Sequence, residues 1–344
     1  MIIFIFLILL LLVSRMQISK EFHRDYLAHE HTLVINGVFV LLVLFSHSFA
    51  NVSNMNMILD LPYKSIQIHL DQAIVIPFLL FSGYGMSLSL MNKKDYMKTI
   101  LKKRLPQLLL HFDIAVIIYL VLSFILGQSY DLKHILLALI GFTSVGNSNW
   151  YIFVMLLLYV FLVFSYFLNK KQNNSFYILC YLIMFSGIYM VMMRLMDMPA
   201  YYYNTILTFS FGFGYALFKD RVDVVFKKYP WLYYLCLLST IILYIVLSPI
   251  KNNSFVYYEI WTLMFSMLLI LVMMKVKFSH PFLKYYGQNV FSIYILQRIP
   301  LHILTALKLN SNSIILVLIT FICTLFLTQV FNKLLDQIDR IIFK

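Results

Sequence analysis

Residues 33–50 read LVINGVFVLLVLFSHSFA, an apolar run that carries Asn36 near its start and His47 near its end. A helix needs about 20 mostly apolar residues to cross the hydrocarbon core of a bilayer, so this run predicts a transmembrane helix. The position of His47 has two interpretations. Either the ring has reached the interface where the helix meets water, or it does chemistry there.

Similar apolar blocks recur along the chain of 344 residues. They predict an all-α fold, a polytopic transmembrane helical bundle with about ten helices in its body and one extra N-terminal helix. The predicted spans are 1–14, 33–50, 70–90, 105–126, 150–168, 176–193, 203–218, 231–248, 256–274, 288–306 and 313–331.

The composition agrees with a membrane protein. Only 12% of the residues are charged, whereas a soluble domain carries about 25%. The net charge of +13 comes from short basic clusters between apolar blocks, which membrane topology explains, so we exclude nucleic acid as a partner. The three cysteines fall inside apolar segments at unrelated spacings and predict no disulfide and no metal site.

Lysine and arginine are divided unequally between alternate loops. One set of loops holds 21 of the 27 basic residues, the other set holds five, and Arg298 lies inside a span. Basic loops stay in the cytoplasm, so we expect the C-terminus inside and the N-terminus outside. The basic loops are 15–32, 91–104, 169–175, 219–230, 275–287 and the residues after 331.

Two apolar segments are short. Residues 132–143 cannot span a bilayer and predict an interfacial or re-entrant helix. Residues 1–14 resemble a signal-peptide core, but no small-residue cleavage site follows them, so we expect a retained helix. The chain then divides into an N-terminal transmembrane helix with a basic linker (1–32), a membrane domain (33–331) and a short cytoplasmic tail (332–344).

Several polar side chains fall near the external ends of spans that are far apart in the sequence. They are His47, Asp71, Gln72, Trp150, Glu259, Arg298 and His302. Ionisable groups in spans are costly and usually face a bundle interior or a wet cavity. Arg298 and His302 share a helix face, and Pro300 between them can kink the helix. Each residue also has a structural interpretation, as an interfacial ring, a helix-start carboxylate or part of an aromatic belt.

The densest basic stretch lies on the predicted cytoplasmic side, in KKDYMKTILKKRLPQLLLHFD (93–113). Lys102, Lys103 and Arg104 at its centre either set the topology and contact anionic lipids, or seat a polyanionic cofactor. His111 and Asp113 at its end do not share a helix face and stay unassigned.

Six stretches in order resemble one family. They are INGVFVLLVLFSHSF (35–49), IPFLLFSGYGMSLSL (76–90), YMKTILKKRLPQLLL (96–110), SNWYIFVMLLLY (148–159), LTFSFGFGYALFKD (207–220) and LKYYGQNVFSIYILQRIPL (283–301). With these stretches, the chain resembles the acyltransferase-3 family of integral-membrane O-acyltransferases over about residues 30–331.

The resemblance implies transfer of an acyl group, usually acetyl from cytosolic acetyl-CoA, to a hydroxyl of a cell-surface polysaccharide, an exopolysaccharide or a lipid-linked sugar. It implies that His47 is the catalytic residue. An imidazole suits removal of a hydroxyl proton, and a covalent acyl-histidine relay is a second possibility. We expect a bacterial plasma-membrane enzyme, with membrane lipids, the glycan acceptor and other polysaccharide-biosynthesis proteins as its partners.

The chain departs from the family pattern at two positions. Asn36 stands where an arginine or lysine is frequent, eleven residues before the histidine, so we expect Asn36, with Lys102, Lys103 and Arg104, to bind acetyl-CoA. Gln297 stands where many members have a histidine. We expect the acceptor to be bound by the outer polar residues Trp150, Glu259, Gln297, Arg298 and His302. Two alternative functions stay open. One is a polysaccharide exporter or flippase, which would use the same outer pocket without an acyl donor, and the other is a glycan polymerase with a lipid-linked substrate.

Overall fold

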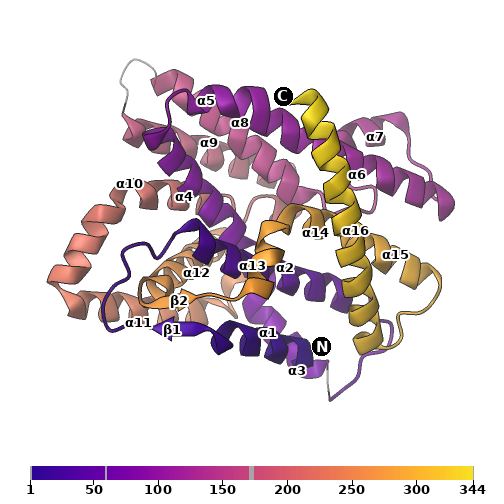
Figure 1. Cartoon of the computed structure of the whole chain (residues 1–344), viewed down its shortest axis with the longest axis horizontal. Helices are drawn as coiled ribbons and strands as arrows, with labels where there is room; N and C mark the ends of the chain where they lie inside the picture. Colours follow the sequence, from indigo (N-terminus) through magenta and orange to yellow (C-terminus); the bar gives the residue numbers. More distant parts are fainter. Residues whose placement is uncertain (1, 59, 170–173, 344) are drawn as a thin grey trace.

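The computed structural model describes residues 2–58, 60–169 and 174–343, and nearly all regular structure in it is helical (Figure 1). The helices and strands are α1 (Ile2–Ser14), β1 (Met16–Ile18), α2 (His29–Ala50), α3 (Leu61–Leu70), η1 (Asp71–Val75), α4 (Ile76–Asn92), α5 (Tyr96–Thr99), η2 (Ile100–Arg104), α6 (Leu105–Ile125), α7 (Leu132–Leu139), α8 (Trp150–Asn169), α9 (Ser175–Leu195), η3 (Ala200–Tyr202), α10 (Leu207–Lys228), α11 (Pro230–Leu247), η4 (Lys251–Asn253), α12 (Phe255–Lys275), β2 (Val276–Phe278), α13 (Pro281–Gln288), α14 (Val290–Leu296), α15 (Arg298–Ala306) and α16 (Ser313–Ile342).

The predicted polytopic helical bundle is confirmed. Within the described residues, eight helical segments are long and apolar enough to cross a membrane: 29–50, 61–92, 96–125, 150–169, 175–195, 230–247, 255–275 and 313–342. The remaining three predicted spans are also helical, but each departs from a regular span. Helix α1 has only 13 residues, α10 carries charges along its second half, and the late segment is divided into α14 and α15.

Helix α10 runs ten residues beyond the predicted end of its span at 218, to Lys228. The hydropathy of the sequence does not predict this extension, because many of its residues are charged. Lys219 and Asp223 are one helical turn apart and pair at 2.7 Å, which stabilises the continuing helix. In the same way, α16 continues through the charged residues after 331 to Ile342.

Prolines and polar caps set many of the helix starts. A proline lies in the first turn of several helices, where its missing N–H costs no hydrogen bond: α3, α4, α6, α11 and α13. The side chain of Asn312 accepts hydrogen bonds from Ile314 N and Ile315 N at the start of α16. Ser254 caps α12 in the same way through Val256 N. Local chemistry of this kind explains why the observed boundaries lie close to the apolar blocks.

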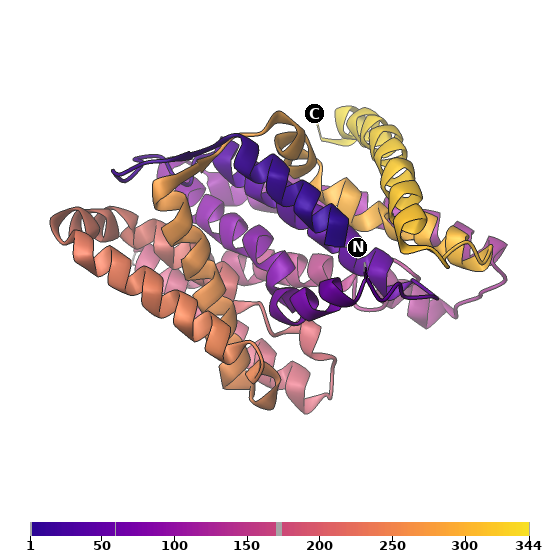
Figure 2. The same cartoon turned by 90° about the horizontal axis from the view of Figure 1, so that it is seen from below.

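The helices form two groups, one at each end of the molecule, and α2 lies between these groups. Helices α10, α11 and α12 lie at one end of the molecule, and α6, α15 and α16 lie at the other (Figures 1 and 2). Helix α2 is the most enclosed span, with 72% of its apolar window buried, whereas α11 has 17% buried. The apolar outer face of α11 therefore suits lipid, and α2 forms the core against which the site is built.

Two helix pairs pack with their backbones in close contact through glycine. On α2 and α13, a Cβ at Gly37 would lie 1.9 Å from Leu283 O, and one at Gly287 would lie 1.8 Å from Leu33 O. On α4 and α10, a Cβ at Gly83 would lie 2.0 Å from Phe209 O. Without a hydrophobic driving force between helices in lipid, such close approach supplies much of the packing energy.

Gly83→Ala is expected to destabilise the bundle by about 1–3 kcal/mol, because the added methyl group forces α4 away from α10. Gly85 on the same helix is the matched control, since a Cβ there meets nothing within 4 Å. Thermal unfolding of the detergent-solubilised protein measures both. If Gly85→Ala lowered the midpoint as much as Gly83→Ala, the close approach of α4 to α10 would not explain the effect.

The linker after α1 is fixed to the body of the protein. Strand β1 pairs antiparallel with β2, and Ser19 N and His23 N donate to the carbonyls of Lys275 and Met274, each at 2.9 Å. The hydroxyl of Tyr26 donates to Asp223 at 2.8 Å, and burial raises the pKa of Tyr26 far above its usual range. Helix α1 in turn packs on α2, with Phe4 and Phe45 rings 5.3 Å apart.

Candidate active site

His47 lies on the wall of a cavity of about 370 Å³ near the C-terminal end of α2. We call it the His47 cavity. Its walls come from α2, η1, the loop before α8, the start of α8, η3 and the α14–α15 segment. The polar and aromatic side chains that face it include Asp71, Gln72, Trp150, Tyr294 and Arg298. Three residues predicted as site residues, His47, Trp150 and Arg298, are therefore brought together from segments more than 100 positions apart.

Residues 144–149 form a tightly bonded loop on one side of the His47 cavity. Ser144 Oγ donates to Asn147 O at 2.7 Å, and Asn147 Oδ1 accepts from Val145 N at 3.0 Å. Asn149 Nδ2 donates to Gly141 O at 2.8 Å. Gly146 takes a φ of +100°, a conformation that favours glycine. These hydrogen bonds and the glycine turn fix the shape of the loop.

Arg298 reaches the cavity because the apolar segment 288–306 breaks at Gln297. Pro300 cannot donate a hydrogen bond to the preceding turn, and α14 ends at Leu296. The Tyr119 hydroxyl donates to Ile295 O at 2.7 Å next to this break. Arg298 follows directly and lines the same cavity as His47.

Several buried polar atoms in the His47 cavity lack a protein partner. Among the described residues, no hydrogen-bond partner is found for His47 Nδ1, Gln72 Oε1 or Asn147 Nδ2. Buried polar groups are normally hydrogen-bonded, so an arrangement of unpartnered donors and acceptors around one cavity favours a polar ligand. The cavity has one strong cation, one imidazole and one carboxylate, the groups needed for a reaction that moves a proton and stabilises a developing negative charge.

A second cavity, of about 430 Å³, lies toward the other end of α2. We call it the Asn36 cavity, since Asn36 lines it together with His29, Ser82, Tyr151, Gln288 and Tyr294. The Asn36 Oδ1 atom is buried and finds no hydrogen-bond partner within the described part of the chain. Asn36 and His47 are eleven residues apart on one helix, which separates them by about 16 Å along its axis.

Packed aromatic rings extend from the wall that the two cavities share. Tyr294 lines both of them, and its ring centroid lies 5.3 Å from that of Tyr151. The Tyr151 ring in turn lies 5.9 Å from that of Phe78. All three side chains are buried. We call Phe78, Tyr151 and Tyr294 the aromatic partition.

Three residues predicted to bind the acceptor lie outside the His47 cavity wall. Gln297 is fully buried, and its Nε2 donates to Tyr294 O at 3.1 Å. His302 lies behind the loop, where its Nε2–H donates to Gly146 O at 2.8 Å. Glu259 is buried in α12, and neither carboxylate oxygen has a protein partner among the described residues. Gln297 and His302 thus support the wall from behind, and Glu259 belongs to neither cavity.

The basic triplet lies in η2, directly before α6, and outside both cavities. Lys102 and Lys103 are exposed. Arg104 Nη1 donates to the Tyr96 hydroxyl at 2.8 Å, and its guanidinium also interacts with Tyr159, which lines the Asn36 cavity. Arg104 is therefore the residue of the triplet that connects to a cavity. His111, unassigned from sequence, pairs with Asp339 of α16 at 2.8 Å.

A family model described as an acyltransferase domain, Acyl_transf_3, matches residues 34–333. The chain belongs to the acyltransferase-3 family. The resemblance inferred from sequence is confirmed, and the protein is a membrane acyltransferase. No curated protein and no solved structure matches the chain. The acyltransferase-3 match contains His47, Arg298 and Asn36, whereas α1 and most of the linker lie before it.

Sequence reasoning did not identify every side chain that faces the His47 cavity of this acyltransferase-3 protein. Tyr294 was missed, although a tyrosine inside the apolar run SIYIL is a signal that could have found it. The polar run GNSN before Trp150 supplies Asn147 and two further lining residues. Within the described residues, no group of three His, Cys, Asp or Glu side chains is placed to hold a metal ion.

Proposed function

We propose that this acyltransferase transfers an acetyl group from acetyl-CoA to a hydroxyl of a cell-surface polysaccharide, an exopolysaccharide or its lipid-linked precursor. The observation that carries the proposal is the pair of cavities on α2, one at Asn36 and one at His47, with Tyr294 in the wall of both. A donor entering at one end and an acceptor entering at the other would meet near Tyr294.

In this proposal the protein lies in a bacterial plasma membrane with its C-terminus in the cytoplasm. The unequal distribution of lysine and arginine between alternate loops supports this orientation. The Asn36 cavity then faces the cytoplasm, where acetyl-CoA is made, and the His47 cavity faces the outside, where the glycan is. The two substrates would approach from opposite sides of the membrane.

The Asn36 cavity fits the narrow part of acetyl-CoA better than the whole molecule. Its lining combines aromatic rings with polar groups, and Asn36 Oδ1 is free to accept a hydrogen bond from an amide of the pantetheine arm. The nucleotide phosphates would remain outside, near Arg104 and the two exposed lysines. Acetyl-CoA supplies the thioester, whose acyl carbon is the electrophile.

At the reacting centre, the proposed work is divided between His47 and Arg298. His47 takes the proton of the acceptor hydroxyl while the hydroxyl oxygen bonds to the acyl carbon. Arg298 stabilises the negative charge that develops on the carbonyl oxygen. His47 then returns the proton to sulfur as the carbon–sulfur bond breaks, and the products are the acetyl ester and free CoA. A covalent acyl-histidine relay would use the same two residues.

The function is tested on the surface glycan of the host, by NMR of its O-acetyl groups in the wild type, a gene deletion and the complemented deletion. We expect the O-acetyl signals to disappear in the deletion and return on complementation. Unchanged acetylation in the deletion would refute an O-acetyltransferase acting on this glycan. Loss of the glycan itself would instead support the exporter or polymerase.

Reversing the charge of Lys102, Lys103 and Arg104 to Glu is expected to weaken acetyl-CoA binding about tenfold or more, since charge-assisted hydrogen bonds to phosphate are lost. Isothermal titration of acetyl-CoA into protein in lipid nanodiscs measures this. A reversal of Arg221, Lys227 and Lys228 on α10 is the control for total charge. Equal binding by both triple variants would remove the basic triplet from the donor site.

A further inference from the structure

Asp71 occupies an unusual backbone position beside the His47 cavity. It lies at the junction of α3 and η1, with φ 34° and ψ −126°. A positive φ is disfavoured for any residue with a Cβ, and such strain persists only where surrounding contacts hold it. The turn divides the 61–92 segment, and Asp71 lines the same cavity as His47 and Arg298.

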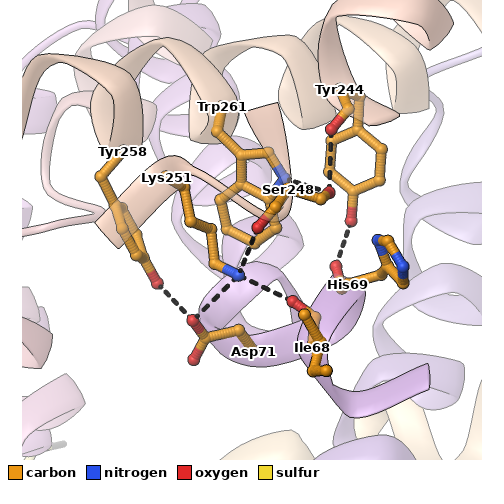
Figure 3. Close-up of polar contacts among 8 residues, drawn as sticks. All are labelled: Ile68, His69, Asp71, Tyr244, Ser248, Lys251, Tyr258 and Trp261. Carbon is orange, nitrogen blue, oxygen red and sulfur yellow. Dashed lines mark hydrogen bonds and ion pairs between the residues drawn. The ribbon is translucent and has the colours of Figure 1, made fainter. Parts of the chain in front are cut away.

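A buried lysine holds this turn in place. Lys251 of η4 is only 2% exposed, and its Nζ lies 2.7 Å from Ile68 O, 3.3 Å from Ser248 O and 3.5 Å from Asp71 Oδ2 (Figure 3). The same ammonium lies 4.7 Å from the ring centroid of Trp261. A buried charge is stable only when paired and hydrogen-bonded. Lys251 therefore joins the loop between α11 and α12 to the turn at Asp71.

Tyr258 completes the support from α12. Its hydroxyl donates to Asp71 Oδ2 at 3.2 Å, so Lys251 and Tyr258 both act on the same oxygen (Figure 3). Among the residues that the structure describes, no partner is found for Asp71 Oδ1, and the side chain keeps 38% of its surface exposed. The carboxylate is thus fixed through one oxygen, and the other remains available for a ligand.

The groups around Asp71 match the chemistry of a sugar with several hydroxyls. A carboxylate oxygen only accepts hydrogen bonds, and a sugar offers adjacent hydroxyl donors. Gln72 Oε1, next along the chain, is a second buried acceptor without a protein partner in the described structure. Trp150 and Tyr201 line the same cavity, and their rings lie 5.9 Å apart, which gives an apolar surface for a sugar ring.

We propose that Asp71 Oδ1 binds one hydroxyl of the acceptor sugar while the neighbouring hydroxyl of the same sugar is acetylated at His47. Lys251 is the positioning residue that holds the Asp71 side chain in the orientation this requires. This inference rests on the proposed function and deepens it, because it assigns the acceptor-binding carboxylate. Asp71 would fix which hydroxyl reaches His47. Lys251 would act only through Asp71.

The test uses protein in lipid nanodiscs, acetyl-CoA, and fragments of the host's surface glycan freed of O-acetyl groups by alkali. Asp71→Asn is the sharpest variant, because asparagine keeps the size of the side chain and tolerates positive φ while removing the charge. We expect Asp71→Asn and Lys251→Met to raise the KM for the glycan about tenfold, the loss typical of a charge-assisted hydrogen bond. The KM for acetyl-CoA should change less than about twofold, because the two cavities are separate.

Two further variants separate positioning from general support. Lys251→Arg keeps the charge and should recover part of the glycan KM. Lys64→Met removes an exposed lysine from the neighbouring α3 and should behave as the wild type. Thermal unfolding identifies any variant that no longer folds. If Lys251→Met is such a variant, Asp71→Asn decides the question.

The outcomes distinguish the inference from the proposed function. A wild-type protein that acetylates neither the fragments nor the intact glycan contradicts the proposed function itself. An active wild type with an unchanged glycan KM in Asp71→Asn overturns only the inference. An equal rise in both KM values in folded Asp71→Asn also overturns it, because that pattern indicates a general structural role.

Discussion

His47→Gln is expected to lower the rate of acetyl transfer by about 10²–10⁴-fold, the contribution typical of general acid–base catalysis. Glutamine fills a similar volume and can hydrogen bond, but it cannot take a proton from the acceptor hydroxyl. The change should appear in kcat, with little effect on acetyl-CoA binding, since Asn36 and His47 line different cavities. Initial rates of labelled acetyl transfer in nanodiscs measure it.

The control for His47→Gln is His69→Gln. His69 is exposed on α3, and the contact it makes to the Tyr244 hydroxyl uses its backbone carbonyl (Figure 3). A His47→Gln protein that folds, binds acetyl-CoA and retains the wild-type rate would remove His47 from the reaction. Mass spectrometry of the wild type, quenched during turnover, separates the two mechanisms. An acetyl group on His47 indicates the relay, and its absence at full turnover favours direct transfer.

Arg298→Met is expected to reduce kcat by about 10²–10³-fold, the cost of removing one donor to a developing oxyanion. Methionine keeps much of the apolar volume of the side chain, so the wall of the cavity stays filled. Arg298→Lys should recover only part of the rate, because a lysine ammonium cannot reproduce the two-pronged geometry of a guanidinium.

The comparison that matters for Arg298 is between kcat and the KM for the glycan. A role in charge stabilisation predicts a loss in kcat at saturating glycan. If Arg298→Met raised only the KM for the glycan and left kcat unchanged, Arg298 would bind the acceptor and take no part in stabilising the transition state.

Much of the site could be predicted from sequence because the depth of a residue in the membrane can be inferred from its position along an apolar span. Alternating basic loops orient the spans, and the orientation places His47, Trp150 and Arg298 at similar depth. These three residues do line one cavity. Depth alone, however, does not give the rotation of a helix about its axis. Glu259 lies on a helix that is apolar on every side, and no stripe in its sequence indicates which face turns toward the cavity.

The support of Asp71 could not be predicted for a different reason. A lysine in a short connection between two apolar spans, as Lys251 is, looks like an ordinary solvated charge. Its burial depends on the carbonyls of Ile68 and Ser248 and on the Asp71 carboxylate, which come together only when the loop packs on the α3 turn. The break at Gln297 was easier to anticipate, because Pro300 acts locally on the chain that precedes it.

The aromatic partition has a consequence for the cell as well as for the reaction. Tyr294 lines both cavities, and its ring packs on Tyr151, which in turn packs on Phe78. A continuous file of water there would conduct protons down a gradient worth about 2.3 kcal/mol per charge at 100 mV. Three packed, buried rings interrupt such a file. In the proposed orientation, these rings would limit the leak of protons through the protein while the acyl group is transferred.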